Sequence, residues 1–443
     1  MLRLKPSPES LRLALVLCLV FAAALAARLI WSAWTAPVPR EYSDPGYYRA
    51  TALSLARGQG YSVHLSGGGL LTGFQPGGEP TAFWPPGYSL FLAVNHVFFG
   101  EGLVVARTAN AIVGALTIVP IYFIGCRLVG RAAGIVGAVI AAMLPSLIFW
   151  TPLLFSDTFF TFLFASVVAL LLYGQRPNGG PRWPFAFATG LLIGCTALVR
   201  GEILVLLPAA VLWWLLSGVR PRAALTAGSA MLVAAVLVLA PWSVRNIRAM
   251  GSPILLSSNF GYNLRIGHAE YSTGRLVAPN DLYIANPGMT FRASESALND
   301  LGTRRAIDYA VHHPARELTL SFRKAMWLWR PDSDVLNWYT IYSPTWILKV
   351  GLVSPLRLLV DYSYVALLVA AAALLLTSAR RALLLPLVLF LSWTAVHIVF
   401  FGEPRFHLPL LTLLAPMAGA SLVWVVGAAR GKISGKNLLR HAA

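Results

Sequence analysis

The stretch from Glu41 to Gly60 reads EYSDPGYYRATALSLARGQG and follows the first long apolar run of the chain. Asp44 stands before a proline, which predicts a helix start: the carboxylate can cap the first turn, and proline has a fixed φ that suits it. Apolar residues then recur at helical spacing, at Tyr48, Ala52 and Leu55. Gly58 stands where such a helix would end. We therefore predict a short amphipathic helix at a membrane surface, with a carboxylate at its tip.

The composition indicates a polytopic membrane protein. Of 443 residues, 57% are hydrophobic and 12% are charged, about half the charged share of a soluble domain. The first apolar run, Leu11 to Trp34, exceeds a signal-peptide core, so we interpret it as a retained span. The three cysteines all lie in apolar runs and predict small buried side chains without a disulfide framework or zinc cluster.

Apolar runs of membrane-crossing length recur along the whole chain. We predict an all-α fold with about ten spans, at residues 11–34, 103–126, 132–151, 158–174, 184–199, 203–218, 223–243, 356–377, 382–401 and 407–428. The fifth and sixth are short for a full crossing. Residues 84–100 begin at a double proline and predict a second surface or re-entrant helix.

The distribution of charge predicts the orientation. One set of connections carries Arg3, Lys5, Arg12, Arg127, Arg131, Arg176, Arg182, Arg220, Arg222, Arg380, Arg381, Arg430, Lys432, Lys436 and Arg440. Positive loops remain in the cytoplasm, so both termini are expected there, in the inner membrane. Every acid except Glu9 then falls on the outer side or at the outer end of a span. This segregation argues against nucleic-acid binding and predicts chemistry on the extracytoplasmic face.

Three regions follow from this topology. Residues 1–243 form an N-terminal transmembrane module whose first outer loop, 35–102, carries Asp44. Residues 244–355 are polar enough for a small extracytoplasmic domain. Its aromatic residues suit an interfacial belt: Trp327, Trp329, Trp338, Tyr339, Tyr342 and Trp346. Residues 356–443 supply the last spans and a basic cytoplasmic tail. The glycines at 67–69, 77 and 78 lack the strand and helix of a phosphate-binding fingerprint and are interpreted as flexible loop.

Two outer carboxylates are the candidate catalytic residues, Asp44 and Asp157. Asp157 lies in LLFSDTFF at the outer end of the fourth span, where an aspartate at membrane depth is costly and functional by default. The alternative for each is a helix cap. Two separated carboxylates facing one cavity suit a general base with a partner that orients the acceptor or holds a divalent cation. No protein metal site is predicted, because His312 and His313 do not share a face.

Outer cations form a second candidate set. Guanidinium groups bind phosphate oxygens in pairs, and the candidates for a lipid phosphate are Arg28, Arg107, Arg200, Arg245, Arg405 and, more weakly, Lys324. The alternative is snorkelling, or pairing with Glu202 or Glu403. Candidates for substrate binding are Tyr47, Tyr48, Glu79, Trp84, Asn263 and His407. His397 lies within a span and is interpreted as an interior residue.

The chain resembles the GT-C superfamily of membrane glycosyltransferases, in particular its glycosyltransferase 39-like branch, kin to protein O-mannosyltransferases and aminoarabinose transferases. The resemblance is carried in order by SDPGYYRATALSLARGQGYS, PTAFWPPGYSLFLA, Ser156-Asp157, APWSVRNIRAMGSPILLSSNFGYNLRIGH and RFHLPLL. It implies a polyprenyl-phosphate sugar donor, transfer on the outer face, and Asp44 as base or acceptor-orienting group. Asp157 would be the second-loop carboxylate.

Two departures from the family pattern concern the acceptor. Protein mannosyltransferases carry an Asp-Glu pair in the first loop, whereas Asp44 is followed by Pro45. Aminoarabinose transferases have a lysine before the double proline, where this chain has Trp84. Neither family's acceptor is therefore carried over, and glycan, lipid and protein acceptors all remain open.

Three other functions were weighed. A transporter or flippase would explain the many spans, but the acids cluster outside and no broken, repeated spans mark a midplane site. A glycan polymerase or ligase with a lipid pyrophosphate donor would suit several outer arginines. A non-catalytic scaffold leaves Asp157 unexplained. The sugar, the acceptor, the metal requirement and the oligomeric state do not follow from the sequence.

Overall fold

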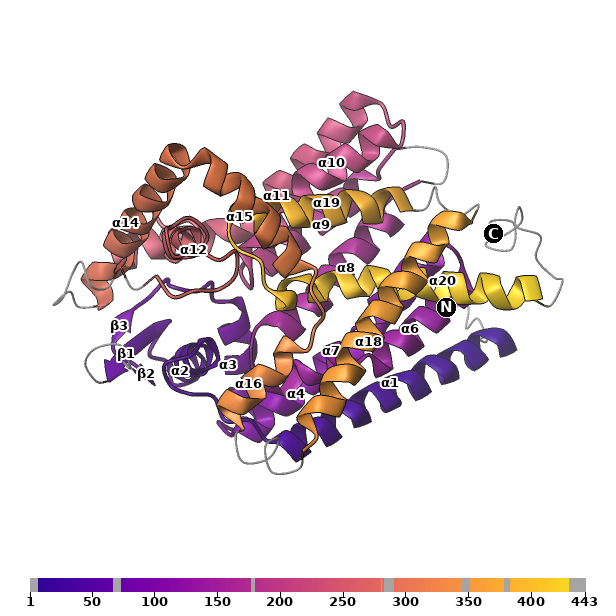
Figure 1. The fold of residues 1–443 in the computed structure, drawn as a ribbon, viewed down its shortest axis with the longest axis horizontal. Coiled ribbons are helices and arrows are strands. Elements are labelled where there is room, and N and C mark those ends of the chain that lie inside the picture. The colour runs from indigo at the N-terminus through magenta and orange to yellow at the C-terminus, as the bar shows by residue number, and fades with distance from the viewer. Residues whose placement is uncertain are drawn as a thin grey trace, which may run out of the picture.

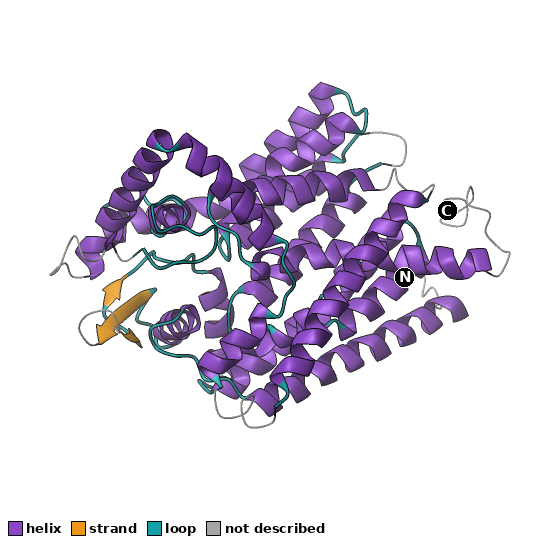
Figure 2. Cartoon of the chain, in the orientation of Figure 1, coloured by secondary structure: helices purple, strands orange, loops and turns teal. Residues whose placement is uncertain are grey.

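The computed structural model describes residues 7–66, 73–176, 180–279, 281–282, 291–343, 351–377 and 383–429. The predictions for Gly67 to Gly69, for Trp346 and for the basic residues at both ends of the chain lie outside these residues. The described chain is almost entirely helical, with one small sheet in the first outer loop (Figure 2).

The helices follow the order predicted from the apolar runs. They are α1 (Pro8–Thr35), α2 (Asp44–Ala56), α3 (Gly87–Phe99), α4 (Leu103–Leu116), α5 (Ile118–Leu128), α6 (Arg131–Met143), α7 (Pro145–Phe149), α8 (Asp157–Tyr173), α9 (Trp183–Ala197), α10 (Leu206–Leu216), α11 (Pro221–Met250), α12 (Phe260–Gly267), α14 (Phe291–His312), α15 (Pro314–Leu328), α16 (Asp334–Tyr342), α18 (Val353–Ala372), α19 (Leu384–Val399) and α20 (Leu408–Ala429). Short 3₁₀ helices are η1 (Thr151–Leu153), η2 (Gly201–Val205), η3 (Ala373–Leu376) and η5 (Pro404–His407).

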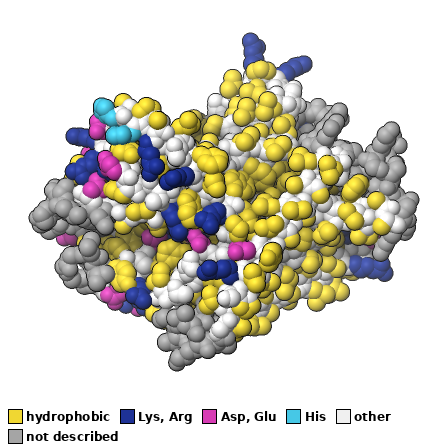
Figure 3. Space-filling model, in the orientation of Figure 1, with side chains coloured by type: hydrophobic (Ala, Val, Ile, Leu, Met, Phe, Trp, Pro, Cys, Tyr) yellow, Lys and Arg dark blue, Asp and Glu magenta, His cyan; other side chains and the backbone are white. Residues whose placement is uncertain are grey.

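The apolar helices form one bundle, and the polar segments gather at one end of it (Figure 1). The first turn of α1 and the last turn of α20 lie at the opposite end from α2, α12 and the sheet. Apolar side chains cover the bundle, whereas charged side chains concentrate on the α12–α15 unit and its boundary with the bundle (Figure 3). This arrangement is that of a polytopic membrane protein with its polar segments at one end.

Five described helices are long and apolar enough to cross a membrane: Pro8–Thr35, Leu103–Leu128, Pro221–Met250, Val353–Leu376 and Pro404–Ala429. A sixth is counted if α6 and the segment Pro145–Leu153 form one span with a 53° bend. The predicted third span, 132–151, is therefore not straight, because Pro145 lacks an N–H donor and interrupts the helix. The remaining apolar helices are shorter, so the number ten stays a prediction.

The first-loop helix forms over the predicted residues, but it is not the predicted amphipathic surface helix, because its polar residues Thr51 and Ser54 are buried together with the apolar ones. Its start also needs a correction. Ser43, not Asp44, is the N-cap, and its hydroxyl accepts a hydrogen bond from Gly46 N at 3.3 Å. The helix ends at Ala56, and Gly58, with a φ of +72°, closes a C-terminal turn in which Gln59 N donates to Ser54 O. Because Ser43 does the capping, the Asp44 carboxylate is available for other contacts.

A three-stranded antiparallel sheet continues the first outer loop. Its strands β1 (Ser62–Ser66), β2 (Gly73–Pro76) and β3 (Glu79–Pro80) are ordered β2-β1-β3. Glu295 of α14 pins this loop, because its carboxylate accepts from Thr81 Oγ1 at 2.5 Å, Ala82 N at 3.0 Å and Ser258 Oγ at 2.8 Å. Burial raises the pKa of this carboxyl.

The aromatic residues predicted to form an interfacial belt pack largely inside the protein. Trp31 stacks on Phe149 with centroids 3.8 Å apart, and its indole donates to Tyr339 Oη at 2.7 Å. Tyr339 and Tyr342 are buried. The belt prediction is wrong for these residues, because the loop after α15 folds back over α1 and α7 instead of lying along the membrane surface.

Two smaller expectations also change. Helix α11 continues past the predicted end of the seventh span, residue 243, to Met250, despite Pro241 within it. The three cysteines are free, as predicted, but Cys18 and Cys195 lie on the outside of the bundle instead of in its interior. An apolar run that faces lipid has the same composition as one that faces other helices.

Candidate active site

Asp44 and Arg405 meet at the polar end of the bundle although 361 positions separate them. Arg405 Nη1 lies 3.6 Å from Asp44 Oδ2, and 34% of the Asp44 side chain is solvent exposed. Helix α2 places the carboxylate in its first turn, and η5 places the guanidinium just before α20. Burial raises the pKa of Asp44, and the charge of Arg405 opposes this rise. Asp44 is therefore a carboxylate in a recess, loosely held and reachable by water.

Asp157 is held far more tightly. Its Oδ1 lies 2.5 Å from Arg200 Nη1, and its side chain is only 3% exposed. Arg200 Nε also donates to Glu202 Oε1 at 2.6 Å, so one guanidinium bridges two carboxylates. The turn before α8 places Leu154 at φ +57°, an unfavourable conformation for a branched side chain. Such strain next to a buried charge is typical of functional sites.

The two carboxylates belong to one site. The Tyr48 hydroxyl, one turn after Asp44, lies 3.5 Å from Ser156 Oγ, the residue before Asp157. The negative charge of Asp157 contributes to the raised pKa of Asp44, while the positive charge of Arg200 lowers it. The site therefore joins the first outer loop, the α8 start, the α9–α10 turn and the α20 start.

Arg405 has a wall of aromatic rings around it. Its Cζ lies 5.1 Å from the Phe155 centroid, 5.7 Å from Trp338 and 5.1 Å from Phe406. Glu403, which was expected to pair with an arginine such as this one, bonds to Arg275 instead, at 3.4 Å. Because Asp44 is its one ion-pair partner among the described residues, Arg405 keeps N–H donors for a further anion.

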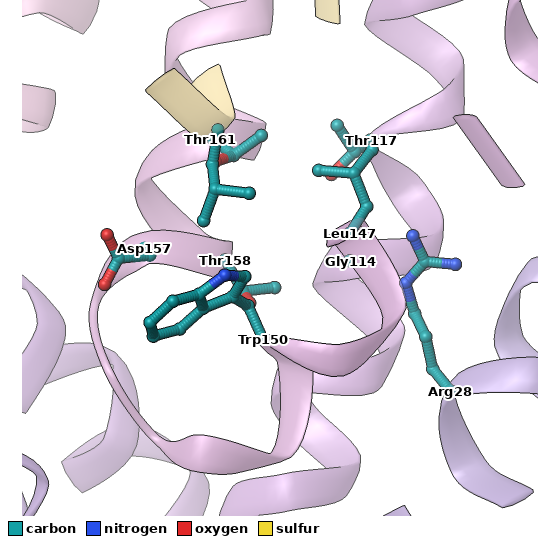
Figure 4. A pocket seen from close by; sticks show the side chains of 9 residues that line it. Arg28, Gly114, Thr117, Leu147, Trp150, Asp157, Thr158 and Thr161 are labelled. Carbon is teal, nitrogen blue, oxygen red and sulfur yellow. The ribbon is translucent and has the colours of Figure 1, made fainter. Parts of the chain in front are cut away.

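A small pocket lies behind Asp157, toward the bundle interior (Figure 4). It holds about 270 Å³ of empty space and is lined by Arg28, Gly114, Thr117, Leu147, Trp150, Asp157, Thr158, Thr161 and Leu408. Figure 4 shows Trp150 between Asp157 and Arg28, with the carboxylate directed away from the indole. Arg28 is 1% exposed and donates to Ala24 O and Ala142 O. It lies inside the bundle, so its predicted contact with a lipid phosphate has no support here.

The other predicted phosphate ligands lie apart from the paired carboxylates. Arg107 Nε donates to Leu103 O on its own helix at 3.3 Å. Arg245 donates to Thr81 O and Tyr61 O at 2.7 and 2.6 Å, which fastens the first loop to α11. Lys324 is fully buried and its amine lies 3.2 Å from His268 Nε2. Burial lowers the pKa of Lys324 to about 8.

The residues predicted to bind substrate lie in different parts of the structure. Trp84 lies beside Tyr48, with ring centroids 6.2 Å apart, at the edge of the site. Tyr47 is fully buried, 2.9 Å from Thr81 Oγ1, and packs in the loop core. Asn263 is partly buried in α12, and Glu79 is exposed in β3. Of these four, Trp84 and Tyr47 lie against Tyr48, each with ring centroids 6.2 Å from it.

His407 is wrong as a substrate ligand. Its Nε2 lies 2.6 Å from Asp332 Oδ1, and both side chains are fully buried. Its Nδ1 lies 2.5 Å from Leu328 O, so each ring nitrogen faces an oxygen atom. The side chain thus ties the start of α20 to the end of α15 and has no exposed surface. His397 is an interior residue as predicted, with Nδ1 2.9 Å from Trp393 O.

Several structural partners were not predicted from the sequence. The carboxylates of Glu295 and Asp332 pair with residues that are far away along the chain, and no local sequence pattern indicates that either is buried. The Trp338 ring beside Arg405 carries an equally weak local signal. Among the described residues, no group of three or more His, Cys, Asp or Glu side chains could hold a metal ion.

The fold is shared with solved membrane enzymes. It matches the apo oligosaccharyltransferase of Archaeoglobus fulgidus with a TM-score of 0.52 at 13% identity, over 96% of this chain and 53% of that one. The same enzyme tethered to an acceptor peptide containing the NVT sequon gives 0.51 at 15% identity, over 96% and 52%. This chain has the GT-C fold. It therefore spans about half the length of these oligosaccharyltransferase chains.

Other comparisons cover part of the chain or are weaker. Residues 84–245 match the profile of the family described as dolichyl-phosphate-mannose-protein mannosyltransferase. The ArnT protein of Cupriavidus metallidurans, bound to undecaprenyl phosphate, aligns with a TM-score of 0.44 at 18% identity, over 93% of this chain and 79% of that one. No curated protein sequence matches the chain significantly. The resemblance read from the sequence is thus confirmed at the level of the GT-C fold.

Proposed function

We propose that this chain is a glycosyltransferase that moves a hexosyl or pentosyl group from a polyprenyl-phosphate donor to a glycan, lipid or protein acceptor. The observation that carries the proposal is the meeting of Asp44 and Arg405 at one open site, next to the locked Asp157. The family profile over residues 84–245 and the shared GT-C fold support the reaction class.

The proposed mechanism uses three groups of this chain. Arg405 holds the donor phosphate, whose bond to the anomeric carbon breaks as the lipid phosphate leaves. An acceptor hydroxyl forms the new bond to that carbon, and Asp44 takes its proton. General base catalysis contributes about 10²–10⁴-fold. Asp157, which Arg200 holds in place, orients the acceptor or the sugar.

The distribution of arginines favours a donor with one phosphate. Arg245 is committed to two backbone carbonyls, Arg200 to two carboxylates, and Arg28 lies in the bundle interior. Arg405 is then the site arginine that keeps N–H donors for a further anion. A lipid pyrophosphate, the donor of a polymerase or ligase, needs more cations than this, so the number of outer arginines no longer supports that alternative.

A divalent cation does not fit the residues present. A metal would have to bind Asp44 and Asp157, yet each already has an arginine within ion-pair distance. Arg405 also supplies the positive charge that a metal would offer to the leaving phosphate. The proposed mechanism uses no metal ion.

The site is proposed to face the extracytoplasmic side of the inner membrane, with both termini in the cytoplasm. The first turn of α1 and the last turn of α20 lie at the end of the bundle away from α2, which carries Asp44 (Figure 1); the proposed orientation rests on the positive-inside rule. A polyprenyl phosphate presents its headgroup at that membrane surface. This position suits a site built from the ends of spans.

The proposal is tested with purified protein in nanodiscs and a panel of labelled polyprenyl-phosphate and polyprenyl-pyrophosphate sugars. We expect release of free lipid phosphate from monophosphate donors, and less than about a twofold change on adding EDTA. Release from pyrophosphate donors alone would favour the polymerase or ligase. Movement of intact donor across the bilayer without bond cleavage would favour a flippase and overturn the proposal.

A further inference from the structure

Helix α15 carries an apolar stripe that no part of the described chain covers. Leu318, Phe322 and Met326 are 77%, 68% and 55% exposed. They recur every four residues and therefore line one face of the helix. Helix α15 belongs to the polar unit, in which such a surface would be costly in water.

Contacts with α19 fix the level of α15 relative to the spans. His268 Nε2 lies 3.2 Å from the Lys324 amine and 2.7 Å from the carbonyl oxygen of Val399, the last residue of α19. Further along, the Trp329 indole donates to Thr394 Oγ1 at 3.1 Å, and its ring lies 5.8 Å from Phe390. Helix α15 therefore runs down beside α19, and its C-terminal end reaches about 7–13 Å below the end of α19, at 1.5 Å per residue.

This register places the stripe at the membrane boundary. Phe322 and Met326 lie within about one turn of Lys324, level with the end of α19. The neighbouring surface of α19 is apolar and open as well, with Leu391 71% and Val399 51% exposed. The stripe thus continues the lipid-facing surface of the bundle onto a helix of the polar unit.

A basic edge follows the stripe around α15. Arg323 is exposed and has no side-chain partner among the described residues. Arg330 and Arg275 both lie against the Trp327 ring, with Cζ 4.3 and 4.5 Å from its centroid. Figure 3 shows Lys and Arg side chains beside apolar ones over this unit, next to the apolar surface of the bundle. Arginines at this level suit the phosphates of anionic lipids.

We propose that α15 is an interfacial helix that inserts Leu318, Phe322 and Met326 into the leaflet on the site side and binds anionic phospholipid through Arg323. Met326 lies deepest and Leu318 nearest the headgroups. Anchoring α15 in this way fixes the positions of Trp338 and η5, which lie beyond its C-terminal end. The aromatic rings around Arg405 are then held in place. The proposal does not depend on the reaction catalysed.

The depth is tested with spin labels in lipid nanodiscs. Cysteine replaces Leu318, Phe322 or Met326 one at a time, in protein whose Cys18, Cys126 and Cys195 are alanine. Leu391→Cys on α19 is the lipid-facing control, and Asp308→Cys on α14, with a side chain 76% exposed, is the aqueous control. We expect labels at 322 and 326 to favour oxygen over a water-soluble nickel complex, as at 391.

Two results would overturn the proposal. Labels at 322 and 326 that behave like the label at 308 would place the stripe in water. Labels shielded from both oxygen and nickel would mean that protein, such as a second copy, covers the stripe. These readings need no transfer assay, so they stand whether or not the proposed function holds.

The lipid class is tested with brominated quenchers and a fluorophore at position 322. Brominated phosphatidylglycerol should quench more strongly than brominated phosphatidylcholine at equal mole fraction. An arginine at an anionic surface contributes about a fivefold preference, so Arg323→Gln should remove most of the difference. Equal quenching by both lipids before this substitution would overturn the anionic-lipid assignment.

Discussion

The two carboxylate–arginine pairs of the site differ in how firmly they are held. Asp157 and Arg200 are 2.5 Å apart, almost buried, and further fixed by Glu202. Asp44 and Arg405 are 3.6 Å apart, and a third of the Asp44 side chain is open to solvent. A base must exchange a proton with a substrate, whereas a positioning group must stay in place. Under the proposed function, this difference suits Asp44 to proton transfer and Asp157 to positioning.

Replacing Asp44 has the largest expected effect on transfer. Asp44→Asn keeps the shape of the side chain but removes the base, so transfer should fall by about 10²–10⁴-fold. Thermal unfolding should change little, because Ser43 caps α2. The measurement is release of lipid phosphate by purified variant protein. Transfer within threefold of the unsubstituted protein would remove Asp44 from the mechanism and reverse the assignment.

Replacing Arg405 should change the pH dependence of transfer, which tests the difference between the two pairs. Arg405→Gln removes a donor to the leaving phosphate, which costs about 10²–10³-fold in rate. Arg405 also lowers the pKa of Asp44, which burial raises. Without Arg405 that pKa rises further, so the acidic limb of the residual pH–rate profile should move to higher pH. Arg245→Gln, a loop-fastening arginine, is the matched control and should leave the limb in place.

An unshifted limb in Arg405→Gln would mean that another group titrates. A limb shifted equally by Arg245→Gln would mean that the shift reports loosening of the first loop instead of the charge of Arg405.

Replacing Asp157 should affect both transfer and stability. Asp157→Asn leaves Arg200 with Glu202 alone in a nearly buried setting, and breaking a buried pair costs about 3–5 kcal/mol. The remaining Glu202 contact places the expected loss at the lower end. Misplaced groups near the chemistry cost about 10–100-fold in rate. Transfer and thermal unfolding are measured on the same preparation.

The acidic limb separates the two roles of Asp157. A positioning residue should lower the rate while the limb keeps its steepness. Complete loss of transfer in a fully stable Asp157→Asn variant would make Asp157 the base.

The sequence predicted those features that depend on local cost. Apolar runs marked the helices, and carboxylates or arginines at their ends stood out because charge near a membrane is expensive. Asp44, Asp157, Arg200 and Arg405 were found in this way. The sequence could not show which of these side chains is free to act on a substrate, because that depends on which charged side chains pair with one another.

The failures have the same origin. Glu202 and Arg200 are neighbours in the chain, and their pairing was foreseen as an alternative. Asp332 lies 75 positions before His407, so no local pattern marks that imidazole as structural. Arg245 looked like a phosphate ligand until its two carbonyl acceptors, on the first loop, were visible. Long-range partners decide whether a polar side chain is free, and single-sequence patterns do not contain them.

The smallest expected effect on transfer belongs to the third acid–cation pair, His407 and Asp332, which is fully buried. His407→Gln leaves the Asp332 charge unpaired and should lower stability by about 3–5 kcal/mol. Transfer per folded molecule should stay within threefold, because the pair does not reach the site. His407→Gln with Asp332→Asn should recover much of the stability, since no buried charge is then left alone. A tenfold loss of transfer in folded His407→Gln protein, unrelieved in the double variant, would place His407 in the site and break the division between working and structural pairs.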